Sequence, residues 1–320
     1  MTLQTLPIEI LYAIIRFIGS DELRKQEGCG LLICKLWYKI ARPVLLADLR
    51  LSATQLVQAP ESADRKIRTY CRILTIDING SGDWPGEHDI DKLNSKLNSL
   101  VDGNNYLRSF TLRARSHFDP AHPLAPRKQY ITKWNPTEFF NMLGTSKLSH
   151  LVIDTYGSEM SGAVHICPRL GLQIPALRSV RLRMRSICPH IFGFSQGDSA
   201  LPGNIECIII NLSLKDTDRF STAFSHHCTE PRSAWNLYDE MITVGTEVAK
   251  KTPSLKVCKI LCHKHPWPDM MTMDCITGAK TVLVGDTWDW GDEGVPDPDD
   301  GMSGNEFSLT DSDFSSASGI

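Results

Sequence analysis

The sequence predicts an α/β protein with a helical N-terminal region, a central part of alternating strands and helices, and an acidic C-terminal tail. Two apolar segments with helical spacing occur within residues 1–50. One short apolar pattern then recurs seven times between residues 71 and 284, and residues 286–320 contain no Lys or Arg. These features predict three regions: 1–50, 51–285 and 286–320.

Residues 6–18 are predicted to form a helix because their apolar side chains recur every three or four positions. Pro7 suits the first turn of a helix, where its missing N–H costs nothing. The apolar side chains fall into two adjacent rows, Leu6–Ile10–Ile14–Phe17 and Leu11–Ile15–Ile18. Together these rows are wider than a helix with one buried face requires. The helix therefore either packs wholly on its own domain or also binds another protein.

The second apolar segment, LLICKLWYKIARPVLL (31–46), also has helical spacing and contains Trp37. Residues 6–46 combine Leu6-Pro7-x-Glu9-Ile10-Leu11, Ile14-Ile15, Phe17-Ile18, Asp21, Leu23, Leu31-Leu32-x-Cys34-Lys35-x-Trp37-Tyr38-x-Ile40-Ala41, Pro43 and Leu45-Leu46. With these residues at this spacing, the first 50 residues resemble an F-box. A segment such as DLRLS (48–52) often follows the motif in fungal-type members, whereas the two glycines of EGCG (27–30) depart from the family pattern.

The resemblance implies that the first helix binds a Skp-type adaptor, which connects to a cullin scaffold and a ubiquitin-conjugating enzyme. One apolar row would pack on the Trp37 helix, and the adaptor would cover the other. The resemblance implies the adaptor-binding residues Leu6, Pro7, Ile10, Leu11, Ile14, Ile15, Ile18, Leu32 and Trp37. A helix that merely caps the following domain is the alternative.

The recurring pattern of the central part is an apolar residue, two residues of any type, a second apolar residue, one residue of any type and a third apolar residue. Its copies are CRILTI (71–76), LRSFTL (107–112), LSHLVI (148–153), LRSVRL (177–182), IECIII (205–210), LKVCKI (255–260) and AKTVLV (279–284). The alternation predicts a short strand in each copy, and residues 90–103, 135–144 and 233–253 read as helices. One strand and one helix per unit predict an irregular leucine-rich-repeat-like solenoid; an ordinary layered αβ domain is the alternative.

In such a solenoid, residues that alternate with the buried ones line the concave face. RAR (113–115) and RLRMR (181–185) place arginines at alternate positions. Arg113, Arg115, Arg181, Arg183 and Arg185 are therefore predicted to form a basic floor that binds an acidic ligand or phosphate, as part of the substrate-binding surface. A merely solvated strand face is the alternative.

Composition is that of an ordinary globular chain, with 42% hydrophobic and 22% charged residues, and no apolar stretch is long enough to span a membrane. The net charge is −3, but ten acidic and no basic residues follow Lys280, so residues 1–280 carry a formal charge of +7. We expect the acidic tail, residues 286–320, to be disordered. The ten cysteines are expected to be reduced thiols, because nothing in the sequence addresses the chain to an oxidising compartment.

The sequence thus predicts a non-catalytic substrate-recognition subunit of a Skp–cullin–F-box type ubiquitin ligase, in the cytoplasm or the nucleus. An interaction scaffold without a ubiquitin role is the alternative, and a serine hydrolase is a remote one. The hydrolase alternative rests on GFSQG (193–197), which matches a serine hydrolase motif around Ser195. Pro202 and Gly203 interrupt the helix that must follow this motif. CHKH (262–265) and HHC (226–228) lack a second ligand cluster at zinc spacing. We therefore expect no metal, cofactor, nucleic acid or membrane partner.

Overall fold

The computed structural model describes residues 6–25, 34–79, 87–101, 104–115, 147–155, 165–195, 203–214, 221–223, 234–263, 270–283, 290 and 295–296. Its helices are α1 (Ile8–Lys25), α2 (Lys35–Ala47), α3 (Ala53–Gln58), α4 (Glu61–Tyr70), α5 (Glu87–Val101), α7 (Cys167–Gln173) and α8 (Ala234–Lys251), with two 3₁₀ helices, η4 (Ile174–Ala176) and η5 (Pro189–Ser195). The main sheet contains β1 (Asp48–Ser52), β2 (Ile73–Asn79), β3 (Ser109–Arg115), β4 (His150–Asp154), β5 (Ser179–Arg183), β6 (Cys207–Asn211), β9 (Val257–His263), β10 (Met270–Asp274), β11 (Lys280–Leu283) and β12 (Val295–Pro296). A short pair, β7 (Ser213–Leu214) and β8 (Ser221–Thr222), forms a second sheet.

The main sheet is mixed. Its ten strands are neighbours in the order in which they occur in the chain, β1-β2-β3-β4-β5-β6-β9-β10-β11-β12. The strands from β1 to β9 are parallel, and β10, β11 and β12 are antiparallel to their neighbours. The reversal after β9 follows from chain length, because only residues 264–269 separate β9 from β10 and a parallel crossover needs about a dozen residues or more.

The expected fold, an F-box helical domain followed by a leucine-rich-repeat-like solenoid, is wrong. The chain is an α/β fold built on one mixed sheet, and β1, which follows α2 directly, already belongs to that sheet. The last of the seven predicted strands lies in the antiparallel part, where β10 occupies the stretch in which a repeat would place a helix. The tail expected to be disordered from residue 286 instead contributes strand β12, which pairs with β11. The predicted helix at 135–144 and the tail beyond residue 296 lie outside the described residues.

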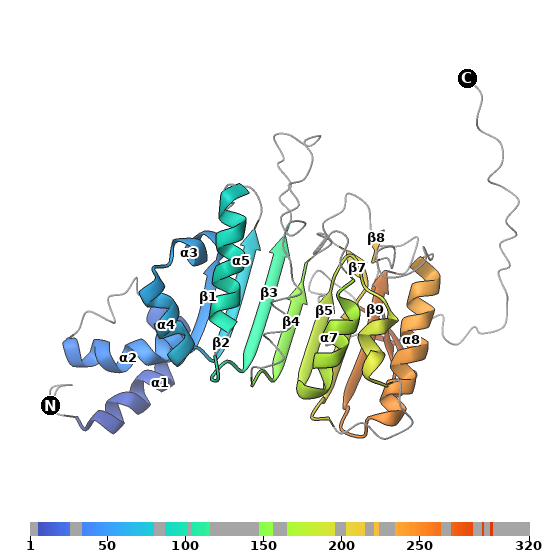
Figure 1. The fold of residues 1–320 in the computed structure, drawn as a ribbon. Helices are drawn as coiled ribbons and strands as arrows, with labels where there is room; N and C mark the ends of the chain where they lie inside the picture. Colours follow the sequence, from blue (N-terminus) through green and yellow to red (C-terminus); the bar gives the residue numbers. More distant parts are fainter. Residues whose placement is uncertain are drawn as a thin grey trace, which may run out of the picture.

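The core lies between the sheet and the helices of one face. Helices α5, α7 and α8 lie on this face, and α1, α2 and α4 gather at the β1 end (Figure 1). One buried row crosses six parallel strands in register: Ile76, Leu112, Ile153, Leu182, Ile210 and Ile260. Each of these side chains is fully buried. Successive residues of a strand face opposite sides of a sheet, and the apolar residues of the alternating pattern are the ones that face the helices.

Helix α7 approaches the backbone of η5 very closely at Gly171. A Cβ atom at this position would lie 2.9 Å from the carbonyl oxygens of both His190 and Ile191. Real Cβ atoms do not tolerate such distances, and the neighbours are backbone atoms that cannot rotate away. A glycine at position 171 is therefore required for this packing.

We expect Gly171→Ala to lower the free energy of unfolding by about 1–3 kcal/mol, because the backbones of α7 and η5 must move apart. Gly193→Ala is the matched control, since a Cβ atom there meets nothing within 4 Å. Urea denaturation of both variants checks the prediction. Equal stabilities of the two variants would show that α7 can shift without cost.

No described helix has the combination of length and apolar character that a bilayer crossing requires.

Candidate protein-binding surfaces

Helices α1 and α2 pack on each other around a small core separate from that of the sheet. Its buried members are Leu11, Ile15, Leu23, Trp37, Ile40 and Ala41. The Sγ atom of Cys34 accepts a hydrogen bond from the backbone N–H of Trp37 at 3.3 Å and so caps the start of α2. Gly19, with a φ of 78°, kinks α1 and allows Leu23 to reach the same core.

The other apolar row of α1 is largely uncovered. Phe17 is 93% exposed, and Ile10, two turns before it, is 48% exposed. Ile8 at the start of α1, and Leu36 and Tyr38 on α2, are also large exposed apolar side chains. We call Ile10 and Phe17, together with the half-buried Ile14 between them, the free row of α1. Because full burial of a Phe side chain is worth about 1.5–3 kcal/mol, a partner that covered this row would gain appreciable binding energy.

The residues expected to bind an adaptor therefore occupy different environments. Pro7 and Ile10 are exposed, whereas Leu11, Ile15 and Trp37 are buried in the core of the helix pair. Three further residues, Leu6, Ile14 and Ile18, are half-buried against that core. Leu32 lies outside the described residues. Of the two rows identified in the sequence, one holds the helices together and the other faces outward.

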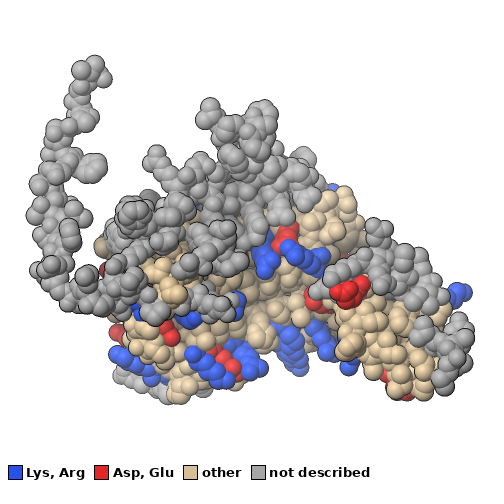
Figure 2. All heavy atoms as spheres, turned by 180° about the vertical axis from the view of Figure 1, so that it is seen from behind, with Lys and Arg blue, Asp and Glu red and all other residues tan. Residues whose placement is uncertain are grey.

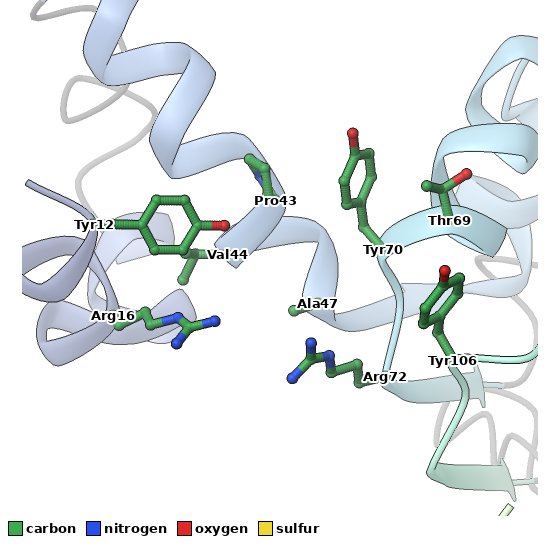
Figure 3. Close-up of a pocket in the computed structure, with 9 residues that line it drawn as sticks. All are labelled: Tyr12, Arg16, Pro43, Val44, Ala47, Thr69, Tyr70, Arg72 and Tyr106. Atoms are coloured by element: carbon green, nitrogen blue, oxygen red, sulfur yellow. The ribbon is translucent and has the colours of Figure 1, made fainter. Parts of the chain in front are cut away.

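A cleft of about 480 Å³ separates the N-terminal helices from the first strands of the sheet. Its lining residues come from α1, α2, α4 and the segments around β2 and β3: Tyr12, Arg16, Pro43, Val44, Ala47, Thr69, Tyr70, Arg72 and Tyr106. Figure 3 shows Arg16 and Arg72 extending from opposite sides below Pro43 and Ala47, with Tyr12 and Tyr70 on the two walls. The guanidinium carbon of Arg16 lies 5.1 Å from the centre of the Tyr12 ring, a cation–π contact that orients it.

The cleft has the chemistry of a protein-binding site, because Tyr and Arg are the residue types that dominate binding hot spots. No acidic residue is among the described residues that line it, so its two arginines give this part of the cleft a positive charge. Nothing in the sequence pointed to this site, since its residues come from four separate segments that only the fold brings together.

The predicted basic floor does not form as expected. It would lie on the sheet face turned away from α5, α7 and α8, where Lys and Arg side chains lie beside Asp and Glu side chains (Figure 2). Arg183 is completely buried, and its Nε and Nη2 atoms donate hydrogen bonds of 2.7 and 2.6 Å to the two carboxylate oxygens of Asp154. The guanidinium also lies 5.3 Å from the centre of the Trp290 ring. Arg183 is therefore a structural residue.

The other arginines of that set are dispersed. Arg113 stands in register between Asp77 and Asp154, so acidic and basic residues alternate across β2 to β5. Arg181 is half-buried between Val152 and Ile209 in the next row, and Arg185 is half-buried beyond the end of β5. Arg115 ends β3 opposite Asn79. Opposite charges on neighbouring strands cancel each other. The spacing of arginines within one strand could not reveal this, because the acidic partners lie on other strands.

A second hollow, of about 730 Å³, lies where the parallel strands begin and includes Arg178, Glu206 and Lys256. Glu206 accepts hydrogen bonds from Arg178 and from Lys256, at 3.2 and 3.0 Å. These bonds hold the pKa of the Glu206 carboxyl below its usual value.

At pH values above the ordinary pKa of glutamate, we expect the ion pairs of Glu206 with Arg178 and Lys256 to stabilise the fold. This stabilisation should be lost as the pH falls through the lowered pKa of Glu206. An NMR titration of the Glu206 carboxyl should therefore give a lower midpoint than an ordinary glutamate. Arg178→Ala should raise that midpoint, and added salt should do the same because the pair is exposed. A midpoint insensitive to both changes would show that the pair is not populated in solution.

The residues that the sequence suggested as a catalytic serine or as metal ligands do not form a catalytic arrangement within the described part of the chain. Ser195 ends η5, a 3₁₀ helix, whereas the hydrolase motif requires a strand before the serine. Burial raises the pKa of the Cys71 thiol, beside the cleft, to about 12, so it is not a thiolate at neutral pH. Cys262 faces the helix side of β9, and residues 226–228, 264 and 265 lie outside the described residues.

Comparison with family models and with curated proteins gave no match for this chain.

Proposed function

We propose that this protein is the substrate-recognition subunit of a Skp–cullin–F-box type ubiquitin ligase. In this proposal α1 and α2 bind a Skp-type adaptor, and the α/β body holds the target protein. The observation that carries the proposal is the free row of α1, with Phe17 93% exposed beside a helix-pair core that is complete without it. The F-box-like order of residues 6–46 supplies the identity of the partner.

The apolar side chains of α1 are divided into a buried row and an exposed row, and this division supports the proposal that a partner binds α1. A helix that served only as a cap would need one apolar row, and Leu11 and Ile15 already provide it. Ile10 and Phe17 contribute little to the fold at their exposures, yet they present a strip of aliphatic and aromatic surface. A partner helix laid along such a strip would bury it through side chains at helical spacing.

The receptor itself performs no bond chemistry in this proposal. Its contribution is proximity, because holding a target beside a ubiquitin thioester turns a bimolecular encounter into an effectively intramolecular one. The cleft with Arg16 and Arg72 is the best candidate for contact with an acidic target segment, since it combines positive charge with tyrosines. The continuous sheet between β1 and β9 would keep bound partners at a fixed separation.

Co-expression with a Skp-type adaptor tests the proposal. The wild-type chain should co-purify with the adaptor and, through it, with a cullin. Ile10→Asp and Phe17→Asp should each weaken adaptor binding by at least about tenfold, because each places a charge in an apolar interface. Both positions are exposed, so thermal unfolding of the isolated variants should stay close to wild type.

Leu172→Asp is the matched control, because Leu172 is 73% exposed on α7, on another part of the molecule. This variant should bind the adaptor like the wild type. Failure of the wild-type chain to bind any Skp-type adaptor would contradict the proposal. Capture of a different partner through the free row would instead identify an interaction scaffold without a ubiquitin role.

A further inference from the structure

Four histidine and cysteine side chains meet where α7 packs against η5. His165 and Cys167 lie at the start of α7, and Cys188 and His190 lie at the start of η5. The Sγ atom of Cys188 is 3.2 Å from Nε2 of His165 and 3.3 Å from Nδ1 of His190. The ligand atoms of His165, Cys167 and Cys188 all lie within 4.8 Å of one another. The two histidine rings pack edge to face, with their centres 5.3 Å apart.

The ligand atoms of His165, Cys167 and Cys188 lie close enough together to bind one metal ion, and His190 joins them through its contact with Cys188. Zinc bonds of about 2.3 Å to sulfur and about 2.0–2.1 Å to nitrogen, at tetrahedral angles, separate neighbouring S and N ligand atoms by about 3.5 Å. The two S–N distances around Cys188 are close to this value. Two sulfur and two nitrogen ligands in tetrahedral geometry select zinc among the common biological metals. We propose that His165, Cys167, Cys188 and His190 bind one structural Zn²⁺ ion.

The sequence contains the ligands as two short clusters, H-x-C at 165–167 and C-x-H at 188–190. Paired short clusters are the usual arrangement of a structural zinc site. The single intervening residue differs from the common C-x₂₋₄-C spacing, so a search for that spacing passes over them. Neither Cys167 nor Cys188 is part of a disulfide, so both sulfur atoms can coordinate a metal.

Burial and position indicate a structural site near the surface. Cys167 and Cys188 are buried, His165 is half-buried and His190 is exposed, so an ion could enter from the His190 side. The bound ion would join the first residue of α7 to η5 across about twenty residues of chain. These two elements already touch where Gly171 meets the backbone of His190 and Ile191, and the ion would fix the start of α7 against the same part of η5.

Metal analysis of the full-length chain, purified under reducing conditions without chelator, tests the inference. Elemental analysis should find about one Zn²⁺ per chain, and Co²⁺ added to the apoprotein should give the intense visible bands of tetrahedral cobalt. Cys167→Ser and Cys188→Ser should lose zinc binding. Cys207→Ser and His150→Gln are the matched controls outside the cluster and should keep it.

A stability measurement covers the case in which the cysteine variants do not fold. A chelator should lower the melting temperature of the wild-type chain, and added Zn²⁺ should restore it. His190→Gln should weaken zinc affinity by at least about tenfold, and an unchanged affinity would overturn its role as the fourth ligand. Absence of stoichiometric zinc together with a melting temperature insensitive to chelator would overturn the site. A Cys167–Cys188 disulfide in the protein purified under these conditions would do so as well.

Discussion

Asp154→Ala is expected to lower the free energy of unfolding by about 3–5 kcal/mol. The substitution removes the carboxylate that accepts both hydrogen bonds from Arg183, whose side chain is 0% exposed. The buried guanidinium has already lost its solvation by water, and the substitution removes its two hydrogen bonds to a counter-charge. The Trp290 ring, 5.3 Å away, compensates only a small part of this loss.

Urea denaturation of the wild type and the variant measures the effect. Glu206→Gln, in the exposed ion pair with Arg178 and Lys256, is the control and should leave the unfolding midpoint close to that of the wild type. Replacement of both Asp154 and Arg183 by apolar residues should recover much of the loss, because no unpaired charge is then buried. A loss below about 1 kcal/mol for Asp154→Ala would show that the pair is effectively solvated.

Leu182→Ala should destabilise the protein by about 2–5 kcal/mol, because it opens a cavity in the middle of the buried row. Leu182 is fully buried between Ile153 on β4 and Ile210 on β6, with which it is in register. Strands on both sides prevent the space from being filled by a local collapse. Similar losses are expected at Leu112, Ile153 and Ile210, which occupy equivalent positions in the row.

Leu172→Ala makes the same chemical change on the exposed surface of α7, where Leu172 is 73% exposed. It should alter stability by no more than about 0.5 kcal/mol. The difference between the two Leu→Ala variants therefore isolates the effect of burial in the row. Comparable unfolding free energies for the two variants would contradict the packing of β5 between β4 and β6.

Much of the secondary structure could be predicted, because the signals are local. Each of the seven copies of the apolar pattern contains most of one observed strand, which generally begins two residues after the copy starts. The helices predicted at 90–103 and 233–253 correspond to α5 and α8. Helix α3 was missed, although Ser52 and Gln55 form a capping box that the sequence displays. Strand β10 was missed because MMTMD does not match the pattern.

The arrangement of these elements was predicted less well. The repeated strand pattern suggested identical units, but it does not distinguish parallel from antiparallel pairing. Pairing direction depends on whether the connection is long enough to cross the sheet, and the six residues after β9 are too few. Strand β1 was not recognised as part of the sheet, although LADLRL (46–51) has the same apolar pattern and β1 begins two residues after it starts.

The sequence by itself determined which side chains of each element are apolar, and thereby the inward row of the sheet and the two rows of α1. It also placed Leu11, Ile15 and Trp37 at positions where they could share one core. Tertiary structure alone decided which charges and ligands meet: Arg183 with Asp154, Arg16 with Arg72 across the cleft, and His165 with Cys188. The physical reason is that periodicity is a property of one segment, whereas a charge pair, a cleft or a metal site needs groups from several segments at defined distances.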